Sequence, residues 1–198
     1  MSCDPDGPLV AEVVRTTSDP FIGRLSLVRV FSGTLSPDTP LHVCGHLQKF
    51  APHHAEGHPD HDSDDERVGP LSAPLGDETK PKPYAIAGDL VLVSKLSAAE
   101  TSDTLSSKAR PALVEPWLLP EPLLPIALHT ISRGDEEKMA SALQRLVAED
   151  VTMRLEHNPE THQVIIWAMG PAHVDKLLTA LRESWHIQVD VEPVRTSL

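Results

Sequence analysis

A cluster of prolines in the middle of the chain constrains the fold more than any other feature. Five of the 19 prolines fall within residues 111–125. Proline fixes φ and has no backbone N–H, so this stretch excludes an ordinary helix and favours extended, semi-rigid backbone. The 198 residues are enough for two cores of about 100 residues each. The sequence therefore predicts two domains joined by a proline-rich linker at residues 109–122.

The first half predicts short strands and frequent turns. Residues rich in β-branched side chains occur at 9–14, 24–31, 41–44, 90–93 and near 104–105. Segments with Gly, Pro, Ser and Asp separate the earlier of these runs, at 18–23 and 32–38. With no helical period present, we expect a small all-β barrel over residues 1–108.

Residues 51–83 interrupt this pattern. They contain six prolines, four histidines and eight acidic residues against three Lys and Arg. Such a composition buries little apolar surface to offset the entropy lost on ordering. We expect a disordered Pro/His/Asp-rich loop here.

The second half has the clearest pattern. Residues 123–130 predict a strand, and an amphipathic helix follows, opened by the acidic run 135–137. Its apolar stripe consists of Met139, Ala142, Leu143, Leu146 and Val147. A hairpin is expected with its turn at 158–161 and its returning strand at 164–167.

A second helix is expected to begin at Gly170-Pro171, followed by a last strand over 187–192. Two helical crossovers around a hairpin give a ferredoxin-like βαββαβ sandwich over residues 123–193, with both helices on one face of four strands. The fold class is thus mixed, a barrel followed by an α/β sandwich. Residues 194–198 are expected to begin a link to a C-terminal region beyond this chain.

Charge and apolar content exclude several classes of protein. A net charge of −12 disfavours binding to free duplex DNA, because such binding depends on Lys and Arg. No apolar run reaches 18 residues, so no membrane partner is expected. Cys3 and Cys44 form neither a disulfide framework nor a zinc motif. A cytoplasmic protein is expected.

Catalytic motifs are missing from the sequence. No glycine precedes a lysine, so there is no phosphate-binding loop, and there is no Gly-x-Ser-x-Gly motif. Cys44 has no context that marks a nucleophile. We therefore expect no catalytic residues and no cofactor in this chain, and a stand-alone enzyme is disfavoured.

The acidic loop has the only metal-like cluster. His53, His54, His58 and His61 are ligand types that suit zinc or nickel, but their spacing matches no rigid site. A solvated loop is the favoured interpretation. An alternative function is a protein-interaction or metal-responsive adaptor with this loop as its sensor. Trp167 and Trp185 are expected in a core, and Trp117 is a candidate wedge between domains.

Several runs resemble bacterial elongation factor G. In the first half these are residues 8–11, 18–25, 29–35, 87–90 and 102–105. From residue 121 onward the chain is similar to the third domain of that family, at 135–138, 148–150, 158–161, 164–166 and 169–170. The resemblance covers nearly the whole chain except residues 51–83.

The resemblance implies a function for a longer parent protein. The parent would be a ribosome-associated translocation GTPase, with GTP and Mg in a domain outside this chain. This chain would contact ribosomal RNA and ribosomal protein, and relay conformational change between its own GTPase domain and the C-terminal domains. Candidate contact residues are Asp19, Phe21, Gly23, Arg24, Arg29, Gly170 and His173.

The sequence also departs from the family. Family members usually have Gly-Glu-Leu-His-Leu-Glu at the second helix, whereas residues 170–175 keep the glycine, the histidine and the last acid and lose the first acid. The acidic loop is unusual too. The resemblance therefore implies a divergent paralogue, and leaves open whether the parent is an active translocase, a recycling factor or an inactive relative.

Overall fold

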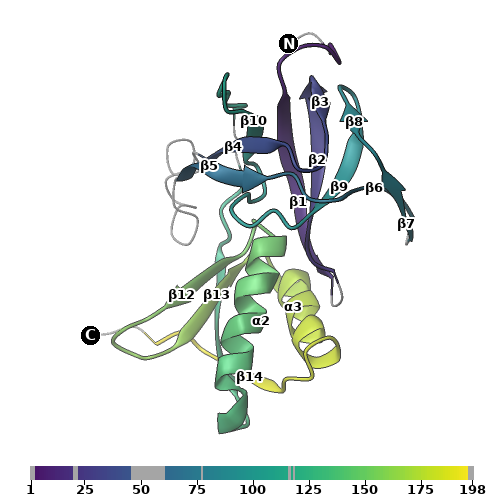
Figure 1. Ribbon diagram of the computed structural model, residues 1–198. Helices are drawn as coiled ribbons and strands as arrows, with labels where there is room; N and C mark the ends of the chain where they lie inside the picture. Colours follow the sequence, from purple (N-terminus) through teal and green to yellow (C-terminus); the bar gives the residue numbers. More distant parts are fainter. Residues whose placement is uncertain are drawn as a thin grey trace. The chain divides into compact units, whose positions relative to one another are not determined.

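The computed structural model describes residues 3–19, 22–45, 61–76, 78–115, 117 and 119–195 (Figure 1). Two compact units are present, and the second begins at Leu119. Each unit has its own buried apolar cluster. Within the described ranges, no helix combines the length and apolar character needed to cross a membrane.

The first unit is a barrel-type arrangement of antiparallel strands. Its eight-stranded sheet has the order β5-β4-β10-β1-β2-β9-β6-β7, and β3 and β8 form a separate pair. The strands are β1 (Val10–Asp19), β2 (Gly23–Ser32), β3 (Thr34–Leu35), β4 (Pro40–Gly45), β5 (His61–Arg67), β6 (Leu71–Leu75), β7 (Glu78–Lys82), β8 (Ala85–Ile86), β9 (Leu90–Ser94) and β10 (Thr104–Ser107).

Alternation along these strands builds a single core. On β2, Val28 and Val30 are fully buried, and Val13, Val91 and Leu105 from neighbouring strands join the same cluster. Successive side chains of a strand point to opposite faces, so the β-branched residues collect on one side. The predicted all-β fold of this half is confirmed.

The prediction of a disordered loop is wrong for residues 61–75 and 78–82. This segment forms β5, which pairs with β4, and the β6–β7 hairpin, in which β6 pairs with β9. Backbone hydrogen bonds order it, and β5 and β7 tolerate polar side chains because they are the two edges of the sheet. Val68 and Leu71 also enter the barrel core. Residues 46–60 lie outside the described part of the chain.

The second unit is a four-stranded antiparallel sheet covered by two helices. Its strands, β11 (Leu124–Thr130), β12 (Arg154–His157), β13 (Val164–Ala168) and β14 (Val189–Glu192), have the order β12-β13-β11-β14. A short 3-10 turn η2 (Arg133–Asp135) precedes α2 (Glu136–Glu149), and α3 (Pro171–Glu183) follows β13. Both helices lie on one face of the sheet (Figure 1). The predicted βαββαβ sandwich is confirmed.

The helical stripes form the core of this unit as the sequence predicts. Leu143 on α2 and Leu177 and Leu181 on α3 are buried against Ile166 on β13. The predicted last strand is shorter than expected. Ile187 is buried but precedes β14, which starts two residues later.

Candidate functional site

Two candidate arginines on β2 are held in place by backbone carbonyls. The guanidinium of Arg24 donates to the carbonyl oxygens of Ser97 and Ala99 at 3.2 and 2.6 Å. Arg29 donates to the carbonyl of Gly88 at 2.6 Å. A carbonyl is a neutral acceptor, so neither bond cancels the charge of the arginine. Each guanidinium is therefore held in a defined position and keeps its positive charge.

A lysine and a carboxylate lie near Arg29. The ammonium of Lys82 is 2.6 Å from a carboxylate oxygen of Asp89. The hydrogen bond from Lys82 lowers the pKa of Asp89, with help from the backbone N–H of Ile86 and from the charge of Arg29. Two cations, Lys82 and Arg29, thus lie near one anion, Asp89.

The β1–β2 hairpin contains three further candidates. Asp19 pairs with Gly23 at the end of the ladder. Gly23 has a φ of +84° with no neighbour near the position of a Cβ, so backbone conformation alone favours glycine here. Phe21 and the side chain of Asp19 lie outside what the structure describes.

His173 links the start of α3 to the end of α2. Its Nδ1 accepts the N–H of Met169 at 3.2 Å, and its Nε2 lies 3.0 Å from Oδ2 of Asp150, the residue that ends α2. A neutral imidazole protonated on Nε2 satisfies both bonds. The His173 side chain is only 12% exposed, so it is turned into its own unit and positions Gly170, the N-cap of α3.

Asp150 is the anionic centre of this link. Burial alone would raise its pKa, but hydrogen bonds from the hydroxyl and N–H of Thr152, together with His173, outweigh burial and lower the pKa. The ammonium of Lys176 is 3.7 Å away. Sequence reasoning selected His173 but missed Asp150, whose role depends on a contact between two helix ends.

Stability of the second unit should therefore fall in acid. A carboxylate with a folded pKa below its ordinary value of 3.8 stabilises the fold above that pH, and this stabilisation is lost as pH falls through the folded pKa. Asp150→Asn should remove this part of the acid dependence, and cost about 1 kcal/mol at pH 7. Urea unfolding between pH 2 and 7 measures both the acid dependence of stability and the cost of the substitution at pH 7.

Asp175→Asn, exposed on the same helix as His173, is the control. An Asp150→Asn protein with the acid slope of the wild type would contradict the assignment.

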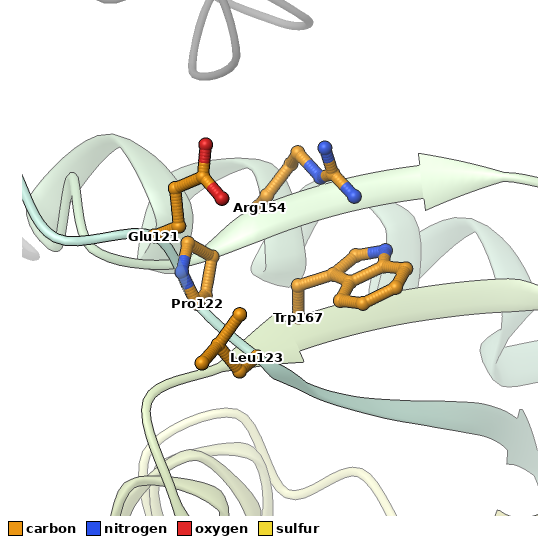
Figure 2. Close-up of a pocket in the computed structure, with 5 residues that line it drawn as sticks. All are labelled: Glu121, Pro122, Leu123, Arg154 and Trp167. Atoms are coloured by element: carbon orange, nitrogen blue, oxygen red, sulfur yellow. The ribbon is translucent and has the colours of Figure 1, made fainter.

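The sheet face opposite the helices has a small cavity. It measures about 160 Å³ and is lined by Glu121, Pro122, Leu123, Arg154 and Trp167 (Figure 2). The guanidinium of Arg154 lies 4.7 Å from the centre of the Trp167 ring, an attractive cation–π geometry. The indole N–H donates to Glu156 at 2.8 Å.

The prediction that Trp167 packs in the core is wrong. Ile166 and Ala168 occupy the helix-covered face of β13, so Trp167 points to the opposite face. Residues 164–168 are all apolar, so the sequence pattern alone does not show which of them points away from the helices. Trp185 does pack against the helical core, with the guanidinium of Arg145 5.3 Å from its ring centre.

The histidine cluster falls mostly outside the described residues. His53, His54 and His58 are not among them, and His61 lies in β5 with its side chain undescribed. Among the side chains that are described, no group of three His, Cys, Asp or Glu residues could hold a metal ion. The metal-responsive alternative gains no support from the part of the chain that the structure shows.

Comparison with known families covers both units. Residues 8–108 match the family described as Elongation factor G domain 2. The chain belongs to the elongation factor G family. Residues 119–193 match Elongation Factor G, domain III, so the two domains of the family occur in the same order as the two units.

Relatives of the elongation factor G family are much longer than this chain. An "Elongation factor G-like protein" of Mycobacterium tuberculosis is 52% identical over the whole chain, which spans 28% of that relative. "Elongation factor G" of Ureaplasma parvum is 31% identical over 95% of the chain and 25% of its own length. A crystal structure of a Thermus thermophilus protein has a TM-score of 0.74 and 27% identity, covering 96% of this chain and 26% of that one.

Proposed function

We propose that this chain is the middle portion of an elongation factor G-like translational GTPase. The supporting observation is the joint match of both units, in family order, to domains 2 and III of elongation factor G. The parent would bind GTP and Mg in a domain outside this chain and act on ribosomes in the cytoplasm. The two units described here would be non-catalytic. They would contact the ribosome and relay conformational change between the GTPase domain and the C-terminal domains.

The proposed ribosome contact on the barrel consists of the β1–β2 hairpin end and the two arginines of β2. Arg24 and Arg29 support this assignment because their charges are fixed in position and not cancelled by their carbonyl partners. Electropositive groups of this kind pair with phosphate oxygens of RNA. Asp19, Phe21 and Gly23 belong to the same proposed contact.

The proposed relay in the second unit runs through the start of α3. His173 and Asp150 couple the two helix ends, so a displacement of one helix end would be transmitted to the other. Gly170 would offer its backbone at this point. The high identity to a relative named "Elongation factor G-like protein" supports a divergent paralogue as parent.

Ribosome-dependent GTP hydrolysis by the full-length protein tests the function. We expect hydrolysis to be slow alone and strongly stimulated by added ribosomes. A full-length protein that binds no GTP, or whose hydrolysis ignores ribosomes, would contradict the proposal.

Salt dependence of ribosome binding tests the barrel contact. Arg24→Ala and Arg29→Ala in the full-length protein should each lower the slope of log affinity against log salt by about one, as expected for the loss of one phosphate contact. Arg110→Ala, at an exposed position outside β2, is the matched control. A slope unchanged in both β2 variants would exclude these arginines as phosphate contacts.

A further inference from the structure

The segment that leaves the barrel is attached to it by a ladder of polar bonds. We call Ala112–Glu115 together with Trp117 the strap. Three of its backbone N–H groups donate to hydroxyl oxygens in or next to β10: Ala112 to Ser106 at 3.2 Å, Val114 to Thr104 at 2.9 Å and Trp117 to Ser102 at 3.4 Å. These three hydroxyl residues are at most 4% exposed. The strap therefore lies along the outer face of β10.

A buried carboxyl lies beside this ladder. Glu12 on β1 pairs with Thr104, and its neighbours Ala11 and Val13 point into the core, so Glu12 faces outward with the hydroxyls. It is nevertheless only 4% exposed. Its pKa is raised by burial, against a side-chain hydrogen bond from Trp117. No described residue donates to its Oε1.

The charged groups around Glu12 in the described part of the chain make no hydrogen bond to its Oε1. Arg29 is its cross-strand neighbour on β2, but the Arg29 guanidinium donates to the carbonyl of Gly88. His42 and Cys44 lie on β4, the strand on the other side of β10 from β1. Glu115 of the strap is exposed.

The chemistry of this contact is that of a reversible attachment. A contact made by apolar surface is costly to open, because that surface becomes exposed to water. On the barrel side of this contact the buried groups are three hydroxyls and a carboxyl, all of which water can solvate once the strap leaves. On the strap side, Val114 and Trp117 are only half-buried. An under-bonded carboxyl is also costly to keep buried, so release of the strap regains its solvation.

We propose that the strap is a releasable tether, which alternates between a docked state on β10 and a free state, with Glu12 favouring release. When it is docked, only one residue separates Trp117 from the start of the second unit at Leu119. Release of the six positions from 112 to 117 adds about 20 Å of possible reach between the units. This inference does not depend on ribosome binding.

Hydrogen exchange of the strap amides in this 198-residue chain tests the proposal. The N–H groups of Ala112, Val114 and Trp117 should exchange by local opening, faster than core amides such as Val28 and Val91. Equal rates for strap and core amides would show that the strap opens only on global unfolding, and would overturn the proposal.

Two substitutions sharpen this test. Glu12→Gln removes the charge, and should slow exchange at all three strap amides about fivefold or more. Ser106→Ala removes one acceptor, and should speed exchange at Ala112 about fivefold. Ser26→Ala is the matched control, since Ser26 is equally buried and its hydroxyl has no hydrogen-bond partner among the described residues. Strap exchange in Glu12→Gln that equals the wild-type rate would refute the role of Glu12 in release.

Discussion

Replacing Glu66 with alanine is expected to lower the free energy of unfolding of the barrel by about 3 kcal/mol. Glu66 lies on β5 and is 4% exposed. Its Oε2 accepts the N–H groups of Ala98 and Ala99 at 2.6 and 3.3 Å, and its Oε1 accepts the hydroxyl of Ser97 at 3.3 Å. Alanine would leave the buried N–H of Ala99 and the half-buried N–H of Ala98 without an acceptor, which costs more than the loss of one ordinary hydrogen bond.

Two variants provide the comparison for Glu66. Glu66→Gln keeps one acceptor oxygen in place and should cost less, about 1 kcal/mol. Glu78→Ala, at an exposed position on β7, should stay within about 0.5 kcal/mol of the wild type. Urea unfolding followed by hydrogen exchange of core barrel amides measures all three. If Glu66→Ala is as stable as Glu78→Ala, the carboxylate does not hold the 97–99 loop.

Leu177→Ala should lower the free energy of unfolding of the second unit by about 3 kcal/mol. Leu177 lies on α3, is 1% exposed and belongs to the cluster that joins both helices to the sheet. Truncating a buried leucine loses its burial and leaves a cavity that the neighbours fill only in part. The expected loss is a large share of the stability of a domain of this size.

Leu123→Ala is the control for Leu177. Leu123 is 78% exposed, so its truncation should change stability by less than about 0.5 kcal/mol. Exchange protection of the amides of β13 reports unfolding of this unit in both variants. A Leu177→Ala protein as stable as Leu123→Ala would mean that α3 does not pack on the sheet as described.

Local patterns were sufficient to predict the second unit. In the sequence, the apolar stripe from Met139 to Val147 predicted a helix facing the core, and alternation and turn residues predicted the strands on each side of it.

The candidate site was predicted only in part. Arg24, Arg29 and His173 were selected by resemblance, but their partners were not. The backbone carbonyls that bind the arginines and the carboxylate of Asp150, all distant in sequence, leave no signal in composition.

The amino-acid sequence by itself determined the two-part division, the fold class of each half and the family. These follow from proline placement, apolar periodicity and runs of residues that are local in the chain. Only the tertiary structure decided that residues 61–75 and 78–82 pair as strands, that Trp167 leaves the core, and that the linker docks on β10. The physical reason is that hydrogen bonds between distant backbone and hydroxyl groups order a polar segment without any apolar pattern to predict it.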